Sequence, residues 1–353
     1  MTDKVPKGWK RVKLGEVVEF NYGKSLPERK RISGDIPVYS SAGITGWHNQ
    51  PLIDSNGIII GRKGTIGKVY KSNVPFYPID TCYYVLPNDK KYNFDFLYYL
   101  LVSLKLDELN EDSAVPGLNR NTAYSQEILL PPFPEQKAIA SVLSSLDDKI
   151  DLLHRQNKTL EKMAETLFRQ WFVEEAKEDW EEVKLGEVVN IRYGKNLPTS
   201  NLIEKGYPVF GGNGLIGYYK EYLYGTPQVL IACRGAASGK VLISLPYSFV
   251  TNNSLILEIP QKSILTFEFL KYYAYSTDFS SYISGSAQPQ ITINDLRNAE
   301  MLLPPKNKII NFSEIIRPVE RKMLYNQQQI RTLEKLRDTL LPKLMSGQIR
   351  VKI

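Results

Sequence analysis

A long duplicated segment constrains this sequence more than any other feature. Residues 9–27 read W-K-R-V-K-L-G-E-V-V-E-F-N-Y-G-K-S-L-P, and residues 180–198 read W-E-E-V-K-L-G-E-V-V-N-I-R-Y-G-K-N-L-P, with thirteen of nineteen positions identical. Further matches follow at offsets of 171 to 173, as far as the Leu-Glu-Lys at 160–162 and 333–335. This period has the size of a domain with an appendage and is too long for a solenoid repeat. The sequence therefore predicts one fold present twice, with an approximate internal two-fold axis.

Length and composition agree with two domains and exclude several other classes. The chain has 353 residues, of which 42% are hydrophobic, and this is enough for two cores of ordinary size. It contains no secretory leader pattern and no run of roughly 18 apolar residues, so we expect a cytoplasmic protein without a membrane span. Cys82 and Cys233 lack neighbouring ligands and do not match each other in the repeat, which predicts buried free thiols without a disulfide or zinc site.

The first part of each copy has the pattern of a mixed α and β domain. Residues 1–133 and 177–305 are rich in Gly, Pro, Tyr and short apolar runs, such as 57–61 and 229–232, which are typical of strands between turns. The longer aromatic segments 94–104 and 267–275 are expected to form helices on the sheet. We therefore predict an α+β fold class.

The second part of each copy predicts a long helix. Residues 134–176 and 306–353 follow Leu-Pro-Pro stretches, and proline often stands before or at the start of a helix. Apolar residues then alternate spacings of three and four, which is a heptad seam. Pro318 is expected to kink the second helix or to mark the start of its regular part. The seams comprise Leu143, Leu146, Ile150, Leu153, Asn157, Leu160, Ala164, Leu167 and Trp171, and Ile316, Val319, Met323, Asn326, Ile330, Leu333, Arg337, Leu340 and Leu344.

One asparagine in each seam suggests how the helices pair. Asn157 takes an a-type position and Asn326 a d-type position, and antiparallel coils pair a with d. If the two amides face each other, Ile150 meets Leu333 and Leu153 meets Ile330. This register predicts an intramolecular antiparallel coiled coil in which a buried amide pair fixes the alignment. The alternative is that both asparagines lie at a solvated edge of the seam.

The charge of the chain is concentrated in its last segment. The net charge is +7, and residues 306–353 contain 11 Lys and Arg against 4 Asp and Glu. Such an excess slightly favours a polyanionic partner. It is equally typical of the solvated surface of a long helix.

These features together resemble the DNA-specificity subunit of Type I restriction-modification systems, and the resemblance covers the whole chain. It rests on Trp9 to Glu16 and Trp180 to Glu187, on the P-P-F-P-E-Q of 131–136, and on the G-S-A-Q-P-Q-I-T of 285–292. Two departures stand out. The second helix opens with Lys306-Asn307-Lys308 in place of Glu-Gln, and residues 115–119 read V-P-G-L-N in place of Q-P-Q-I-T.

The resemblance implies a four-part, pseudo-two-fold architecture. Two target recognition domains (1–133 and 177–305) would be joined by two spacer helices (134–176 and 306–353), and each domain would read one half of a bipartite, asymmetric site in double-stranded DNA. The helices would dock two modification (methyltransferase) subunits, and restriction/translocase subunits would join them. This chain would hold no cofactor, since S-adenosylmethionine, ATP and Mg²⁺ belong on the partner subunits. The alternative is a coiled-coil adaptor for proteins without DNA specificity.

Catalytic motifs in the chain itself are incomplete, which predicts a noncatalytic protein. Leu130-Pro131-Pro132-Phe133 lacks the Asn or Asp of an adenine methyltransferase motif. The glycine-rich stretch 234–241 is one residue short of a P-loop and ends in Val, where a magnesium-binding hydroxyl is required. His48 and His154 have no evident Ser or Cys partner for a triad.

Candidate DNA contacts combine cations for phosphates with amides, hydroxyls or Arg that can reach base edges. For any one of them, the alternative is an ordinary loop cap or surface residue. The first copy offers Lys24, Ser40, Ser41, Arg62, Lys63, Thr65, Asn119, Arg120 and Asn121, and the second offers Lys195, Asn213, Arg234, Ser238, Lys240, Asn252, Asn253, Gln288 and Gln290.

Overall fold

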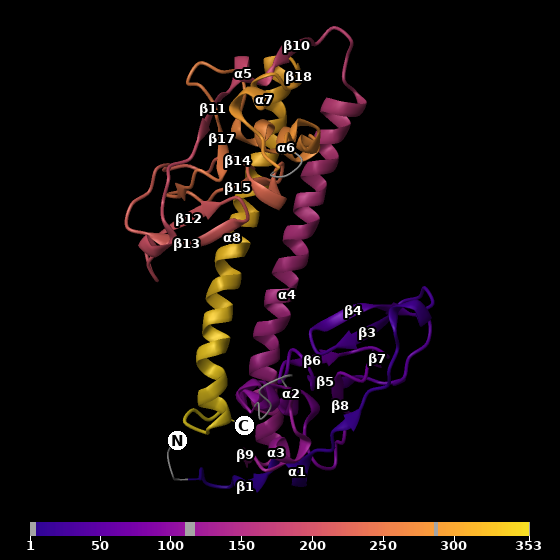
Figure 1. Ribbon diagram of the computed structural model, residues 1–353. Coiled ribbons are helices and arrows are strands. Elements are labelled where there is room, and N and C mark those ends of the chain that lie inside the picture. Colours follow the sequence, from indigo (N-terminus) through magenta and orange to yellow (C-terminus); the bar gives the residue numbers. More distant parts are fainter. Residues whose placement is uncertain (1–4, 110–116, 286–288, 353) are drawn as a thin grey trace. The chain divides into compact units, whose positions relative to one another are not determined.

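The computed structural model describes residues 5–109, 117–285 and 289–352, and the chain divides into two compact units (Figure 1). Unit 1 comprises residues 1–153 and 328–353, and unit 2 comprises residues 154–327. Each unit therefore contains the globular part of one copy and a stretch of each long helix. The division of the sequence at residues 133, 176 and 305 stays a prediction, because the compact units are defined by contacts and cut through both helices.

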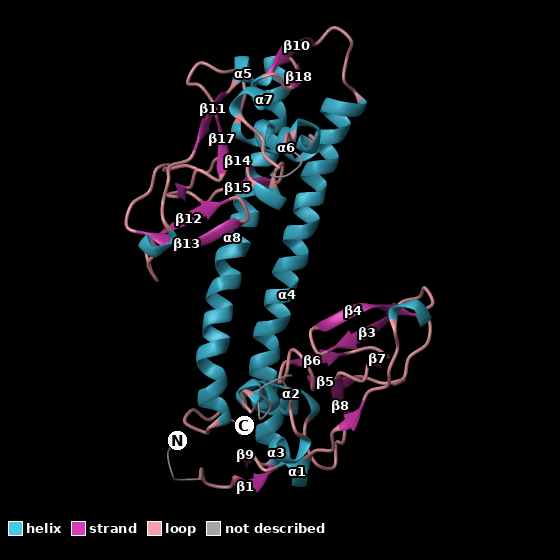
Figure 2. Cartoon of the chain, in the orientation of Figure 1, coloured by secondary structure: helices cyan, strands magenta, loops and turns pink. Residues whose placement is uncertain are grey.

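Unit 1 contains three small sheets (Figure 2). An antiparallel pair joins β1 to β9, a four-stranded antiparallel sheet has the order β2-β8-β5-β6, and a third sheet has the order β4-β3-β7 with β3 and β7 parallel. The strands are β1 (Lys10–Lys13), β2 (Asn21–Tyr22), β3 (Ile36–Ser40), β4 (Gly43–His48), β5 (Gly57–Gly61), β6 (Val69–Ser72), β7 (Tyr77–Pro78), β8 (Cys82–Val85) and β9 (Glu127–Leu130). The helices are α1 (Leu14–Val17), α2 (Phe94–Ser103), α3 (Arg120–Tyr124), the first part of α4 (Phe133–Arg169) and the last part of α8 (Lys306–Met345), with 3₁₀ turns at Glu28–Lys30 and Leu106–Glu108.

Unit 2 repeats this topology strand for strand. Its sheets have the orders β10-β18, β11-β17-β14-β15 and β13-β12-β16. The strands are β10 (Glu181–Lys184), β11 (Asn190–Tyr193), β12 (Tyr207–Gly211), β13 (Gly214–Tyr219), β14 (Val229–Ala232), β15 (Val241–Ile243), β16 (Phe249–Val250), β17 (Ser254–Glu258) and β18 (Glu300–Leu303). The helices are the last part of α4, α5 (Leu185–Val188), α6 (Phe267–Ser276), α7 (Ile293–Arg297) and the first part of α8, with a π-helical turn at Gln170–Glu174 and 3₁₀ turns at Thr199–Asn201, Gly235–Ala237 and Phe279–Tyr282. The prediction of one α+β fold present twice is confirmed.

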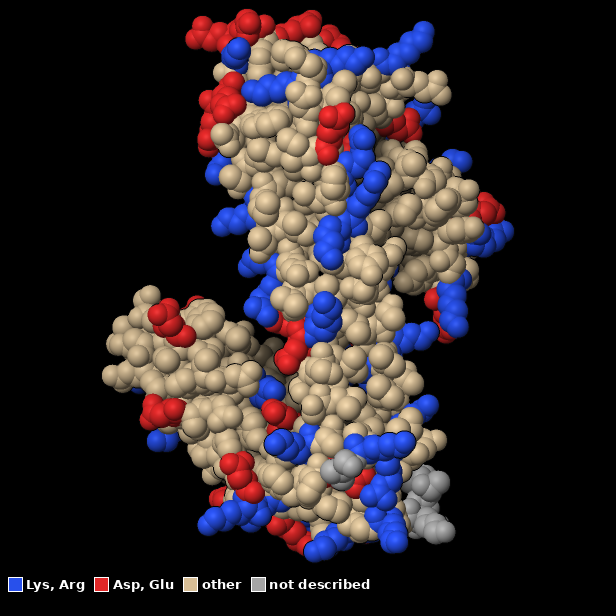
Figure 3. All heavy atoms as spheres, turned by 180° about the vertical axis from the view of Figure 1, so that it is seen from behind, with Lys and Arg blue, Asp and Glu red and all other residues tan. Residues whose placement is uncertain are grey.

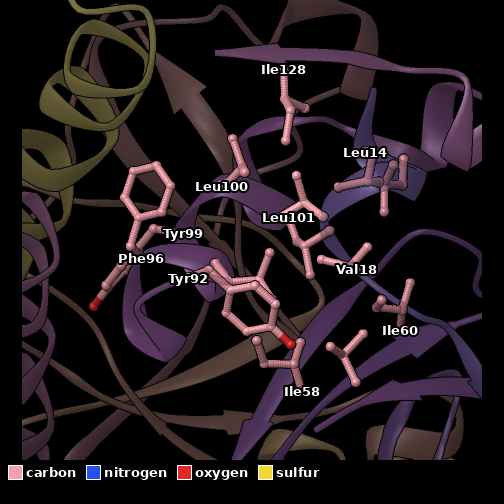
Figure 4. Packing of buried hydrophobic residues seen from close by; sticks show 14 of the residues in the cluster. Leu14, Val18, Ile58, Ile60, Tyr92, Phe96, Tyr99, Leu100, Leu101 and Ile128 are labelled. Atoms are coloured by element: carbon pink, nitrogen blue, oxygen red, sulfur yellow. The ribbon is translucent and has the colours of Figure 1, made fainter. Parts of the chain in front are cut away.

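The central strand of each large sheet is buried on both faces, which explains its uninterrupted apolar sequence. In β5, Ile58 and Ile60 point into the main core of unit 1, and Ile59 points into a smaller cluster with Tyr39 and Phe76. Alternation of this kind follows from the two-residue period of a strand. Figure 4 shows Ile58 and Ile60 converging with side chains of α1 and α2 in the main core. In β14 of unit 2, Val229 and Ile231 face one cluster and Leu230 the other.

Both long helices begin directly after their Leu-Pro-Pro stretches. The helix α4 begins at Phe133, and α8 begins at Lys306 and continues through Pro318. The expectation that Pro318 marks the start of the regular helix is therefore wrong, because twelve residues of helix precede it. Within the described ranges, neither these helices nor any other is long and apolar enough to cross a membrane.

The helices pair in an antiparallel way within each unit, in the predicted register. In unit 1, Ile150, Leu153 and Ile330 form a buried cluster with Leu333 packed against it. In unit 2, Nδ2 of Asn326 donates to Oδ1 of Asn157 at 2.8 Å, and Asn326 is fully buried. The amides thus face each other, and the alternative of a solvated edge is wrong for Asn326.

The seam of α4 departs from the predicted heptads near its end. Phe168 and Phe172 are buried there, whereas Leu167 and Trp171 are only partly buried. The physical reason is that the end of α4 and the π-helical turn that follows it, which contains Trp171 and Phe172, enter the core of unit 2. The ring of Phe172 lies 5.0 Å from that of Phe269 there.

Candidate nucleic-acid interface

Five of the nine residues predicted in the first copy line one cleft of about 410 Å³ in unit 1. The loop after β5 meets the segment before α3, where residues 63 and 117 form a β-bridge and the N–H of Leu118 donates to the carbonyl of Arg62 at 2.9 Å. Asn119 caps α3 by accepting from the N–H of Asn121. Cations and amides thus converge, and this combination suits a backbone phosphate beside base edges. The predicted residues in the cleft are Arg62, Lys63, Asn119, Arg120 and Asn121.

An aromatic platform supports the cations of this cleft. The guanidinium carbons of Arg62 and Arg120 each lie 5.3 Å from the ring centre of Tyr22. Tyr83 lies in edge contact with Tyr22, and its hydroxyl donates to the carbonyl of Leu118 at 3.1 Å. Burial raises the pKa of Tyr83 to about 12. The hydroxyl therefore stays protonated at neutral pH and keeps its role as a hydrogen-bond donor.

The other predicted residues of the first copy do not line this cleft. Ser40 accepts from the N–H of Ala42 within the turn between β3 and β4, and Ser41 is buried. The side chain of Ser40 therefore supports the hairpin, which is a common role of serine in turns. Lys24 and Thr65 are exposed on neighbouring loops.

Four predicted residues of the second copy line a larger cleft of about 920 Å³ in unit 2. It lies between the loop after β14 and the β12–β13 hairpin, and it includes Thr199 and Ile216. The elements that line this cleft therefore differ from those of the first cleft, although the loop after the central strand lines both. The predicted residues here are Asn213, Arg234, Lys240 and Asn253.

The remaining predicted residues of the second copy serve the backbone around this cleft or lie beside it. The hydroxyl of Ser238 donates to the carbonyl of Pro289 at 3.0 Å, and Gln290 forms a β-bridge with Arg234. The N–H of Asn252 donates to the carbonyl of Lys195 at 3.2 Å. Gln288 lies outside the described residues.

The repeated Tyr-Gly-Lys motif has a steric explanation in both copies. A Cβ atom on Gly23 would collide with the carbonyl oxygens of Pro78 and Ile79, and one on Gly194 would collide with those of Val250 and Thr251. Glycine is therefore required for the close approach of two backbones. The motif is needed for the fold, and it sets the backbone position of the lysine that follows.

Sequence reasoning missed the tyrosines of the first cleft. Tyr22 is 50% exposed and Tyr124 packs under Arg120, yet neither is among the predicted DNA contacts, because tyrosine is more often a core or sheet residue. A usable signal existed for Tyr22, because it lies in the repeated motif directly beside an invariant Gly-Lys of the two copies. No comparable signal marked Tyr83, whose counterpart in the β17 register is Leu255.

The two cysteines are buried, and this sets their reactivity. Cys82 and Cys233 are buried free thiols, as predicted, and burial raises the pKa of Cys82 to about 12. Its thiol is therefore not a nucleophile at neutral pH. In the part of the chain that the structure describes, no three His, Cys, Asp or Glu residues form a group that could hold a metal ion.

The fold and the two clefts are those of a duplicated nucleic-acid-binding protein. The chain carries two copies of one α+β domain and a pair of long helices, and each copy has a cleft of cations and amides suited to a nucleic acid. A family model for the Type I restriction modification DNA specificity domain matches residues 6–162 and 177–338. The chain belongs to this family, and it is a noncatalytic specificity subunit.

Known relatives are similar along most of their length. The Type I restriction enzyme MjaIX specificity subunit of Methanocaldococcus jannaschii is 26% identical, over 99% of this chain and 95% of that protein. The EcoprrI specificity subunit of Escherichia coli is also 26% identical, over 82% and 77%. The crystal structure of a Type I restriction-modification S subunit from M. genitalium matches with a TM-score of 0.68 at 19% identity, over 98% of this chain and 97% of that one.

Proposed function

We propose that each copy reads one half of a bipartite, asymmetric site in double-stranded DNA, on behalf of a Type I restriction-modification complex. The observation that carries this proposal is the contrast between a repeated frame and unlike clefts. The strand order is the same in both units, whereas the residues around the loop after the central strand differ. Because bases are distinguished by side chains that reach groove edges, two unlike clefts on one frame suit two different half-sites.

The charge pattern supports local contacts over a uniform attraction to DNA. Figure 3 shows small groups of Lys and Arg on one face, separated by much uncharged surface and by Asp and Glu. A net charge of +7 on 353 residues is modest. Binding is therefore expected to depend on the few cations of each cleft and on cations supplied by partner subunits.

The helices supply the spacer and the docking surface in this proposal. Both α4 and α8 contribute to both units, so they connect the two reading domains. In unit 2 they leave an apolar groove of about 550 Å³, in which Met163 is 58% exposed and Ile315 48% exposed. Apolar side chains left in water favour a protein partner. Two modification subunits would dock on the helices, restriction/translocase subunits would follow, and S-adenosylmethionine, ATP and Mg²⁺ would bind to those partners.

The test measures binding of the complex with modification subunits to its target duplex at several salt concentrations. Lys63→Ala and Arg234→Ala each remove one cation from a cleft, so each is expected to weaken binding and to reduce the salt slope by about one. Lys262→Ala is the matched control, because Lys262 is exposed and lines neither cleft. Binding that ignores sequence and salt, with partner assembly intact, would instead identify an adaptor for proteins.

A further inference from the structure

The first copy holds two arginines over a single tyrosine ring. Arg62 and Arg120 both lie over Tyr22, and each contacts a second ring, since Arg62 lies 5.8 Å from the centre of Tyr83 and Arg120 lies 5.9 Å from that of Tyr124. A planar guanidinium stacks well on aromatic faces, and stacking restricts its motion while its edge stays free to donate. Both side chains line the cleft of unit 1.

The two guanidinium groups differ in what they have left to donate. Nε and Nη2 of Arg62 both donate to the carbonyl of Asp80, at 3.3 and 2.8 Å. Within the described part of the chain, the guanidinium of Arg120 lies over two rings and makes no hydrogen bond, so its N–H donors have no protein acceptor there. Two like charges on one ring repel each other, and this arrangement is not one that stability of the fold alone favours.

The second copy shows that the frame does not require these arginines. In the strand register, Gly61 pairs with Cys82 as Ala232 pairs with Ser254, which makes Cys233 the counterpart of Arg62. Asn119 and Thr292 cap α3 and α7, which makes Ile293 the counterpart of Arg120. Unit 2 forms the same sheets and helices with neither guanidinium. The pair is therefore a feature of one copy, at the place where the copies differ.

We propose that Arg120 determines the specificity of the first copy by donating two parallel hydrogen bonds to O6 and N7 of a guanine in the major groove. Arg62 is a positioning residue, since it holds the face of Tyr22 and lends charge near a phosphate. Arginine is the usual partner of guanine because its fork matches these two acceptors, and a stacked, preordered fork loses less entropy on binding. This inference rests on the proposed DNA-reading function and assigns a residue and a base to it.

The test uses the assembled complex and a set of target duplexes substituted one base pair at a time. Arg120→Ala is expected to reduce discrimination at a single G·C pair of the first half-site by about ten- to a hundredfold and to leave the second half-site unchanged. Arg120→Lys should not restore it, because an ammonium group is a point charge without a fork. Lys63→Ala, which removes an equal charge from the same cleft, should weaken all duplexes about equally.

A second measurement begins with the unaltered complex, and this part does not depend on the folding of Arg120→Ala. Replacing that guanine by 7-deazaguanine removes the N7 acceptor and should weaken binding of the unaltered complex. The same replacement should have little effect on an Arg120→Ala complex that assembles normally. The inference is overturned if Arg120→Ala weakens every duplex equally, which identifies a phosphate contact, or if the deaza base has no effect at any position. Loss of the proposed function would look different, because the unaltered complex would then show no sequence preference.

Discussion

At the scale of single residues, the first turn of each long helix contacts the tryptophan of its copy, and the residue that makes this contact has opposite charges in the two copies. Glu135 of α4 is 1% exposed and accepts from Nε1 of Trp9 at 2.9 Å and from two nitrogens of Arg350 at 2.8 and 2.7 Å. Its counterpart in α8 is Lys308, which lies 5.1 Å from the ring centre of Trp180 and 3.6 Å from the carboxylate of Glu175. The unusual Lys306-Asn307-Lys308 opening is thus compensated by an acidic partner.

Removing the carboxylate of Glu135 tests this packing. Glu135→Ala leaves the buried indole N–H of Trp9 without its acceptor, so we expect a loss of about 1–3 kcal/mol in the free energy of unfolding. Circular dichroism during urea unfolding at pH 7 measures the loss. Glu127→Ala is the control, because it removes an exposed ion pair with Arg11 and should cost much less.

The pH dependence of the same carboxyl gives a second readout. Hydrogen bonds from Arg350 lower the pKa of Glu135 below its ordinary value of 4.5. A carboxyl with a lowered pKa stabilises the fold above its unfolded pKa, and this contribution is lost as the pH falls through the folded value. The difference in stability between the unaltered protein and Glu135→Ala should therefore shrink below about pH 4.5. A constant difference down to pH 2 would contradict this assignment.

At the scale of secondary-structure elements, a tyrosine, a carboxylate and a cation attach α2 of unit 1 and α6 of unit 2 to a long helix. In unit 2, Nζ of Lys271 donates to both oxygens of Glu320 at 2.7 and 2.8 Å, and the hydroxyl of Tyr272 donates to it at 2.6 Å. In unit 1, the hydroxyl of Tyr99 donates to Asp147 at 2.6 Å, and the cation comes from Arg337. The carboxylates correspond in the repeat, and the cations come from different elements.

Glu320→Ala is expected to destabilise unit 2 strongly. It leaves Lys271, which is 6% exposed, as a buried charge without its partner, and breaking a buried pair in this way costs about 3–5 kcal/mol. Adding Lys271→Met removes the stranded charge and should recover much of that loss. Hydrogen exchange of the backbone amides of α6 measures the stability of unit 2 in each variant. If the double variant is no more stable than Glu320→Ala, the ion pair is not the main contact.

The facing amides of Asn157 and Asn326 make a prediction about helix pairing. Asn326→Leu removes the donor to Asn157, whose own Nδ2 still donates to the carbonyl of Met323 at 3.2 Å. We expect each single leucine variant to cost about 1 kcal/mol and the Asn157→Leu and Asn326→Leu double variant to be more stable than either. Thermal unfolding of all four proteins gives the coupling energy. Additive effects would mean that the two amides act independently.

At the scale of the whole molecule, the repeat made the architecture predictable and left the reading residues undetermined. The central strands, the helices 94–104 and 267–275, and the pairing of Asn157 with Asn326 follow from periodicity and duplication, because burial imposes those patterns. The aromatic platform under Arg62 and Arg120 could not be predicted from these patterns, because its tyrosines come together only when β2, β8 and α3 pack in the fold. Ser40 and Asn119 show a second limit of the sequence patterns. Serine and asparagine are common in turns and helix caps as well as among DNA contacts, so the residue type alone does not distinguish these roles.

The same reasoning explains why the clefts differ while the frame does not. Buried positions such as Ile58 and Val229 have few alternatives that fill the same space, so they retain their character in both copies. Arg120 and Ile293 occupy equivalent places with different surroundings, since Arg120 lies over the rings of Tyr22 and Tyr124 and Ile293 packs against the core of unit 2. Divergence can therefore accumulate at the reading positions without loss of the fold.

The central claim is that two diverged copies of one reader recognise two different half-sites, and exchange of one copy tests it most directly. Residues 1–133 would be replaced by the matching segment of a relative with a different target, and the methylated sites would be mapped in cells that carry the modification subunits. The account predicts that one half of the methylated sequence changes and that the other half and the spacer stay the same. Changes in both halves together, or in neither, would contradict it.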